Sequence, residues 1–391
     1  MIINKMARIV HLYWVYALFG GAKALVSILG PIYLYRLGFS FHEIILYFIM
    51  TAIVKVAALF LVFKLASKFG PRVTMATGIL LMVAHFVCFS AVESHGMPLY
   101  VVGSLLGLAN AFFYPSFRLS FSFVTETKKA GMQVAKLNTI SMVFTVASPV
   151  VGGVIAGLFG VVAVYYLAAA LFFGTFVFLL LRNNGGERYI RQFNLSNIPR
   201  GGAVRDYLSN ASYSFSGLAD LLVWPLFIGL LIPTYAGIGG YAGLLVGMSV
   251  IVQLWVGKIA DRKGESLFLG AGVTLSLAYN VLRVFISSVG QLIGLSILNA
   301  LGSSLLASSY GSRFYKNVDT RRRLEYLFMM ELANSVTWLL YFPVLLGLSY
   351  LLSFDDALRV GIMLIAPAVI GMVFMRSRQR VQRDELAEAS I

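Results

Sequence analysis

Twelve long apolar runs constrain the fold of this chain more than any other feature. Each holds about 20 or more mostly apolar residues, which is the length an α-helix needs to cross a bilayer. Of the 391 residues, 59% are hydrophobic and 12% are charged, whereas roughly 25% are charged in a soluble domain. The sequence therefore predicts an all-α integral membrane protein with twelve transmembrane helices. These helices are expected at residues 11–35, 43–65, 72–93, 98–123, 132–158, 160–182, 206–231, 236–256, 266–288, 290–312, 324–348 and 356–375.

Lysine and arginine are distributed very unevenly between the connecting segments. With the N-terminus in the cytoplasm, 25 of the 31 basic residues fall in cytoplasmic segments and only Arg36 and Arg359 fall on the other side. This asymmetry predicts a multi-pass protein of the plasma (cytoplasmic) membrane with both termini cytoplasmic. It also accounts for the net charge of +15. Because the basic residues are spread over short loops that would face anionic lipid, we expect a membrane lipid partner and no nucleic acid.

A short sequence occurs twice, about half a chain apart. "FKLASKFG" begins at residue 63 and "GKIADRKG" at residue 257, an offset of 194 residues. The same offset superposes Pro31 on Pro225 and Gly78 on Gly272. The chain is therefore expected to form two six-helix pseudo-repeats in parallel orientation. The predicted domains are residues 1–182 and 206–375, with a linker at 183–205 and a tail at 376–391.

These motifs carry a resemblance to a known family. "GKIADRKG" resembles the loop signature of the major facilitator superfamily, roughly G-x-L-A-D-R-x-G, and "FKLASKFGPR" looks like its first-half copy. "SPVVGG" is similar to the GPxxGG element of helix 5 in the family's exporters. The resemblance implies a twelve-helix transporter fold with a solute site between the halves. The residues that carry it are Ser67, Gly70 and Arg72 in the first copy, Gly257, Asp261, Arg262 and Gly264 in the second, and Pro149, Gly152 and Gly153 in helix 5.

The second copy retains an acidic residue that the first copy lacks. The resemblance places the loop after helix 8 near the start of helix 5, where an acidic side chain gains from the helix dipole. We expect Asp261 to cap helix 5 around Met132 to Ala135 and to hold the halves together on the cytoplasmic side. In the first copy Ser67 can form only a weaker hydrogen bond. The alternative is that Asp261 simply contacts solvent.

Six ionisable residues lie inside the predicted spans, where each costs about 2.5–3.5 kcal/mol at a helix centre. They are Lys23, Lys55, Arg118, Asp220, Arg283 and Glu331. One hypothesis pairs Lys23 with Asp220 across helices 1 and 7, or places both on one substrate. A second pairs Lys55 with Glu331 as a gate between the halves. For Lys23 and Asp220 the alternative is that backbone or water satisfies each residue separately.

The remaining polar residues of the spans are weaker candidates. Arg118 either contacts substrate or protons or snorkels to the interface, and for Arg283 we expect snorkelling. His85 is expected to be a packed core histidine. Asn110 and Asn299 are the intramembrane asparagines expected to face the cavity, because the resemblance lines that cavity with helices 4 and 10. Scattered histidines and a single cysteine, Cys88, give no metal-ligand spacing.

No motif for direct use of ATP and no enzyme site is present, so neither a cofactor nor enzymatic activity is expected. The sequence predicts a secondary active transporter that moves a small organic solute by alternating access. Protons would provide coupling through Asp220 or Glu331, since a carboxylate that is desolvated in one state and paired in another changes its pKa. The motif in helix 5 favours export, and the excess of intramembrane cations favours an anionic or zwitterionic solute. The alternatives are a lipid or lysolipid flippase or scramblase, or a non-transporting sensor. The resemblance implies a monomer.

Overall fold

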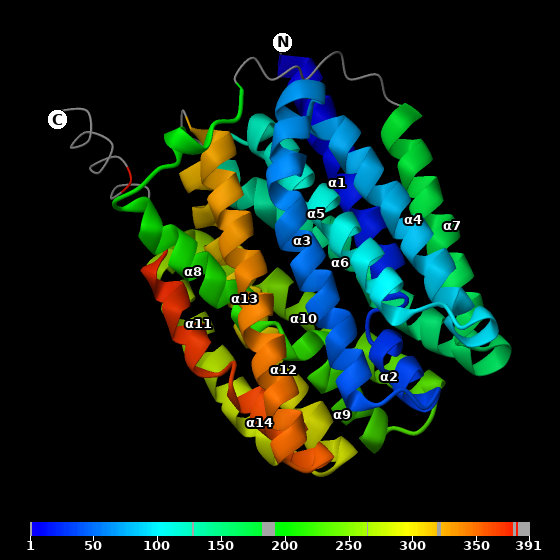
Figure 1. Cartoon of the computed structure of the whole chain (residues 1–391). Coiled ribbons are helices and arrows are strands. Elements are labelled where there is room, and N and C mark those ends of the chain that lie inside the picture. Colours follow the sequence, from blue (N-terminus) through cyan, green and yellow to red (C-terminus); the bar gives the residue numbers. More distant parts are fainter. Residues whose placement is uncertain are drawn as a thin grey trace.

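The computed structural model describes residues 2–126, 129–181, 192–263, 265–318, 322–377 and 381, without the side chains of 2–5, 254–263 and 265. The described residues form helices and no strand. Figure 1 shows these helices running side by side along one common direction. The N-terminal half contains α1 (Ile2–Ala24), α2 (Leu29–Arg36), α3 (Phe41–Phe69), α4 (Pro71–His95), α5 (Leu99–Val124), α6 (Ala130–Phe159) and α7 (Val161–Leu181).

The C-terminal half repeats this arrangement. It contains α8 (Ala203–Ser216), η3 (Ala219–Leu221), α9 (Val223–Leu231), α10 (Tyr235–Lys263), α11 (Glu265–Leu282), η4 (Arg283–Phe285), α12 (Val289–Val318), α13 (Arg323–Leu351), α14 (Phe354–Met363) and η5 (Pro367–Phe374). A short turn, η2 (Leu195–Asn197), precedes it. In the described part of the chain, 12 segments are long and apolar enough to cross a membrane. The predicted number of spans is confirmed, and their bounds differ from the predicted ones mostly by a few residues.

The first and seventh spans are each broken at the same place in the repeat. Residues 25–28 separate α1 from α2, and adding 194 gives 219–222, which lie between α8 and α9. Pro31 and Pro225 are each the third residue of the helix that follows the break. A proline cannot donate to the carbonyl four residues earlier and clashes with it, and those residues, Ser27 and Leu221, lie inside the breaks. The sequence-based expectation of continuous helices is therefore wrong for these two spans.

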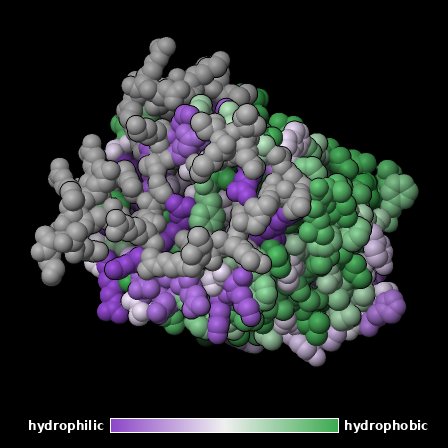
Figure 2. Space-filling view, turned by 90° about the horizontal axis from the view of Figure 1, so that it is seen from above, coloured by the Kyte–Doolittle hydropathy of each residue, from purple (hydrophilic) through white to green (hydrophobic). Residues whose placement is uncertain are grey.

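The two ends of the helix bundle differ in polarity. Because the number of spans is even, α1 begins and η5 ends on the same face, here called the terminus face; the opposite one is the far face. Figure 2 shows the terminus face, with hydrophilic residues gathered on it and hydrophobic residues on the flank. Its exposed basic residues include Lys64, Lys68, Lys129, Lys136, Arg200, Arg205 and Arg322.

The first copy of the repeated motif forms a tight turn on the terminus face. Gly70 ends α3 with φ of 86°, a value that favours glycine, and Pro71 begins α4. Arg72 donates from Nη2 to the carbonyl oxygens of Leu179 and Leu180, at 2.7 and 3.0 Å, and so caps the last turn of α7.

Ser67 does not form the expected hydrogen bond with another helix. Its hydroxyl donates at 2.8 Å to the Lys64 carbonyl of its own helix, so in this structure it bonds within α3. In the second copy, Gly264 and the side chains of Asp261 and Arg262 lie outside the described residues. The same holds for any contact at Gly257, whose backbone belongs to α10. The proposed contact of Asp261 with α6 therefore remains a prediction.

The glycines of the helix-5 motif allow α6 to approach two other helices on its far-face side. A Cβ atom at Gly152 would overlap the Leu25 carbonyl oxygen in the first break, and one at Gly153 would lie 2.6 Å from the Tyr235 carbonyl oxygen of α10. Pro149, also buried, precedes them in α6. The motif therefore lets α6 contact both the broken first span and the other half of the protein.

The halves contact each other near both faces. Near the far face, Arg36 donates at 2.7 Å to the carbonyl oxygen of Pro233, and Tyr35 stacks on Phe354 at 5.2 Å between ring centroids. Near the terminus face, Arg323 donates at 3.0 Å to the carbonyl oxygen of Ser122. The polar side chains described next lie between these two sets of contacts.

Candidate transport site

A buried ion pair joins the two halves in the middle of the bundle. Arg118 of α5 donates from Nη1 to Oε1 of Glu331 in α13 at 2.5 Å. The Glu331 side chain is 1% exposed and that of Arg118 is 25% exposed. The Arg118 guanidinium also lies over the Phe314 ring, 5.4 Å from its centroid. Arg118 is thus held between the halves and does not snorkel.

Lys55 does not form the predicted pair with Glu331. Its Nζ donates at 3.1 Å to Oδ1 of Asn334, one helical turn along α13, and lies 5.2 Å from the centre of the Trp338 ring. Glu331 instead accepts through Oε1 from Arg118, whose side chain reaches it from α5. Lys55 remains within electrostatic reach of Glu331.

The predicted pair of Lys23 and Asp220 is also absent. Lys23 donates from Nζ to the Tyr114 hydroxyl at 2.8 Å. It occupies the last turn of α1, where the negative end of the helix dipole stabilises an ammonium group. Asp220 lies in η3 and pairs through Oδ1 with Nη1 of Arg283 at 2.5 Å. Both residues lie at helix breaks, but each has its own partner.

The expectation that Arg283 snorkels is wrong. Its side chain is 0% exposed, whereas that of Asp220 is 49% exposed. The guanidinium lies between two aromatic rings, 5.2 Å from the centre of Trp224 and 5.0 Å from that of Tyr279. Its Nε and Nη2 atoms are buried without a hydrogen-bond acceptor. The aromatic faces and Asp220 together stabilise this charge.

A cavity of about 170 Å³ lies between the halves on the terminus-face side. It is called here the near cavity. Side chains of α1, α5, α6, α8 and α12 line it, including Tyr16, Tyr114, Arg118, Asn138, Tyr213 and Tyr310. Five of these six side chains carry an aromatic ring or a charge, and all can form hydrogen bonds. The near cavity can therefore hold a polar or charged solute that both halves contact.

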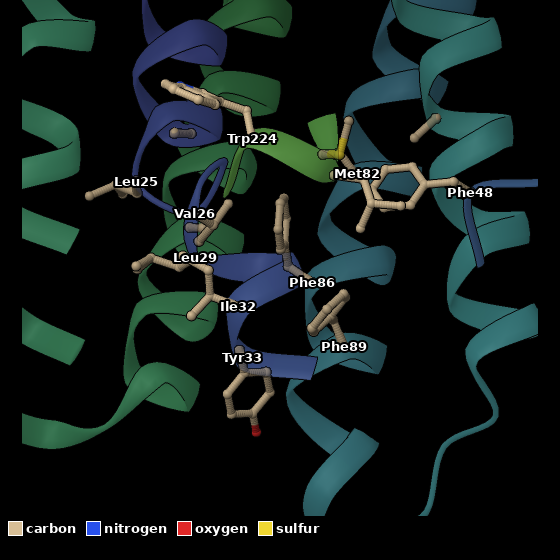
Figure 3. Close-up of a cluster of buried hydrophobic side chains, with 14 of the residues drawn as sticks. Leu25, Val26, Leu29, Ile32, Tyr33, Phe48, Met82, Phe86, Phe89 and Trp224 are labelled. Atoms are coloured by element: carbon tan, nitrogen blue, oxygen red, sulfur yellow. The ribbon is translucent and has the colours of Figure 1, made fainter. Parts of the chain in front are cut away.

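A second cavity of about 110 Å³, called here the far cavity, lies farther toward the far face. Its walls include Lys23, Phe48, Phe86, Asn110, Tyr165 and Trp338. Figure 3 shows Phe48, Phe86 and Phe89 with Val26 of the first break. Since Lys23 lines the far cavity and its partner Tyr114 lines the near one, their hydrogen bond lies between the two cavities.

Two of the three polar residues Asn110, Asn299 and His85 line the far cavity. Asn110 is buried and lines the far cavity, in agreement with its expected position. Asn299 of α12 is half-buried and lines neither cavity. His85 is buried, as expected, and its Nδ1 donates at 3.0 Å to the carbonyl oxygen of Val102. It also lines the far cavity, which the sequence did not indicate.

Sequence reasoning missed Tyr114, which connects the two cavities. Asn110, Tyr114 and Arg118 are spaced by four residues, so they follow one face of α5 from the far cavity to the near one. That spacing of polar residues in an apolar helix could have identified Tyr114. Asn334 and Trp338 of α13 are spaced in the same way and face Lys55.

A bundle of two parallel six-span halves, with charged residues and cavities at their junction, has the architecture of secondary transporters. The sequence model of the Major Facilitator Superfamily matches residues 12–250. The chain belongs to this superfamily. No curated protein matches the chain.

Solved structures show the same fold. The E. coli fucose:proton symporter FucP is 14% identical, with a TM-score of 0.66, and the match covers 96% of this chain and 100% of that one. FucP in its outward conformation gives a TM-score of 0.67 at 14% identity, with the same coverage. A bacterial homologue of the iron transporter ferroportin, in an outward-facing state, is 15% identical with a TM-score of 0.67, covering 94% of this chain and 98% of that one.

Proposed function

We propose that the protein is a proton-coupled secondary transporter that moves a small organic solute by alternating access. The ion pair between Arg118 and Glu331 carries the proposal. The two residues belong to different halves, so a rocking motion of the halves must strain or break the pair. Protonation of Glu331 removes its charge and weakens the attraction, which couples proton binding to the motion.

The charge balance around this pair favours a solute with a negative charge. Arg118, Lys23 and the Glu331 carboxylate all lie within electrostatic reach of Lys55. Three cations with one carboxylate leave a formal excess of two positive charges in a region of low dielectric. An anionic solute in the near cavity would reduce this excess and would compete with Glu331 for Arg118.

We further propose export, with the terminus face in the cytoplasm of a plasma-membrane protein. The exposed basic residues of that face support this orientation. The close packing of Gly152 and Gly153 against the first span and α10 supports a stable closure of the far-face side. A solute would then enter from the cytoplasm. On this proposal the protein works as a monomer without an enzymatic step, and its partners are lipid, solute and protons.

The test uses purified protein in liposomes with a trapped pH dye and an imposed proton gradient. Anions, zwitterions, cations and lysolipids are added one at a time to wild type, Glu331→Gln and Glu325→Gln. Glu325 is the matched control because it is a buried carboxylate of the same helix, which accepts a hydrogen bond from the Asn194 backbone. We expect a solute that moves protons through wild type and Glu325→Gln but not through Glu331→Gln. Transfer of a lipid probe between leaflets without proton movement would contradict the proposal and favour lipid handling.

A further inference from the structure

The far cavity has an apolar wall with a single charged residue. Phe48, Phe86, Phe89 and Trp338 contribute aromatic rings to it, and Lys23 contributes the charge. The residues that line it include no Asp or Glu. Since an apolar cavity of about 150 Å³ accommodates benzene, the far cavity, at about 110 Å³, has room for at most one small ring.

Two polar groups in this apolar wall have no hydrogen-bond partner. Asn110 is 5% exposed and Tyr165 is 1% exposed. The Oδ1 atom of Asn110 and the hydroxyl of Tyr165 are both buried without a partner. An unsatisfied polar group is destabilising inside a protein, and buried polar groups are nearly always satisfied. A ligand that forms hydrogen bonds with these groups would remove that penalty.

His85, another polar residue of the wall, has its ring tautomer fixed by a hydrogen bond. A carbonyl oxygen only accepts, so the hydrogen bond from His85 to Val102 places a proton on Nδ1. In the neutral ring Nε2 is then an acceptor. His85 can therefore accept a hydrogen bond from a hydroxyl group of a ligand, as Asn110 can.

Lys23 supplies the charge at one end of the cavity. Its hydrogen bond to Tyr114 uses one of its three ammonium protons. No described carboxylate forms an ion pair with it, and its ammonium lies where α1 ends. The Tyr165 hydroxyl lies beside Gly30, 4.0 Å from the place of a Cβ atom there, and Gly30 is seven residues beyond Lys23 toward the far face. The cationic end and the hydroxyl end are therefore separated along the bundle axis.

We propose that the far cavity binds an amphipathic monocarboxylate: its carboxylate on Lys23, a single ring against the aromatic wall, and a hydrogen-bonding substituent toward Asn110 and Tyr165. The proposal rests on the proposed function, since it names the class of the transported solute and places it on the other side of the Lys23–Tyr114 hydrogen bond from the near cavity. A zwitterion is disfavoured, because the lining residues offer no carboxylate for its ammonium group. A neutral ring compound lacks the attraction to Lys23.

Thermal unfolding of the purified protein tests the binding. The probes are 4-hydroxybenzoate, cyclohexanecarboxylate, benzyl alcohol and phenylalanine. We expect 4-hydroxybenzoate to raise the unfolding temperature most, cyclohexanecarboxylate less, and the other two least, since stabilisation follows affinity. Binding of 4-hydroxybenzoate should weaken at least about tenfold in Lys23→Met and about threefold to tenfold in Asn110→Leu or Tyr165→Phe.

Tyr165→Phe distinguishes a hydroxyl that binds ligand from one that only stabilises the fold. Removing an unpartnered hydroxyl should leave the unliganded protein as stable as wild type or more stable, while ligand binding weakens. Tyr166→Phe, an exposed neighbour, is the control and should change neither. A lower unfolding temperature of unliganded Tyr165→Phe, or equal binding by all variants, would overturn the proposal.

The same samples in liposomes separate this proposal from the proposed function. Uptake of 4-hydroxybenzoate into the liposomes without proton movement would overturn proton coupling and support the substrate class. Proton movement that depends on Glu331 and is driven only by other solutes, without binding of ring carboxylates, would support the coupling and overturn the substrate class.

Discussion

Two of the ion pairs among the described residues have the same length and different connectivity. Arg118 and Glu331 join α5 to α13 at 2.5 Å, whereas Asp220 and Arg283 join η3 to η4 at the same distance. The first pair crosses between the halves beside the near cavity. The second lies within the C-terminal half, and its arginine is fully buried under aromatic rings.

The pair between the halves can act in the proposed transport cycle, whereas the pair within one half stabilises the fold. When two halves rock as rigid bodies, distances within a half are retained and distances between halves change. On the proposed mechanism, the pair of Arg118 and Glu331 therefore changes with the motion and the pair of Asp220 and Arg283 does not. The pair of Asp220 and Arg283 instead fixes the broken seventh span against the end of α11.

The largest expected effect comes from breaking the pair within one half. Asp220→Asn leaves the buried Arg283 guanidinium without a counter-charge, and we expect the free energy of unfolding to fall by about 3–5 kcal/mol. Thermal unfolding in detergent measures it. Asp355→Asn, which breaks an exposed pair with Arg359, should change it by less than about 1 kcal/mol. A stable Asp220→Asn protein that has lost proton movement would instead place Asp220 on the proton path.

Glu331→Gln should abolish proton movement driven by the solute, because the coupling carboxylate is gone. The protein should lose less stability than Asp220→Asn does, since Arg118 is partly exposed and retains the contact with Phe314. The pH-dye assay and thermal unfolding of the same preparation measure both quantities. Retention of proton movement in this variant is the outcome that contradicts our assignment.

Exchanging the two charges tests whether the interaction between Arg118 and Glu331 contributes to stability. Arg118→Glu and Glu331→Arg should each destabilise the protein, and the double variant should recover about 1–3 kcal/mol relative to the sum of the single changes. Transport should not recover, because the cation would no longer line the near cavity. A double-mutant cycle of unfolding free energies measures the coupling, and a value of zero would mean that the pair does not form in the membrane.

The smallest effect is expected at Lys55, which donates to a neutral amide. Lys55→Met removes a buried charge without leaving a buried countercharge unpaired, because Glu331 retains Arg118. Stability should therefore change by no more than about 1 kcal/mol in either direction. A loss as large as that of Asp220→Asn would show that Glu331 depends on both cations.

Hydropathy predicted the spans because crossing a membrane depends mainly on local composition. The partners of the charged residues depend instead on how each helix is rotated about its axis. The repeat offset gives no information about that rotation. Lys23 lies just before the first break and Asp220 within the second, yet Lys23 bonds to Tyr114 and Asp220 pairs with Arg283. The breaks themselves had a signal, since Pro31 and Pro225 coincide at the offset of 194. The burial of Arg283 had no signal in the sequence, because this burial depends on the Trp224 ring lying over the guanidinium.

The most direct test of the account is the distance between spin labels on opposite halves, at Lys129→Cys and Arg322→Cys of the terminus face, with Cys88 replaced by Ser. Both positions are exposed. We predict that Glu331→Gln shifts the distance distribution between the labels relative to wild type, and that Asp220→Asn does not. Identical distributions for wild type and Glu331→Gln would contradict the claim that the Arg118–Glu331 pair holds the halves together.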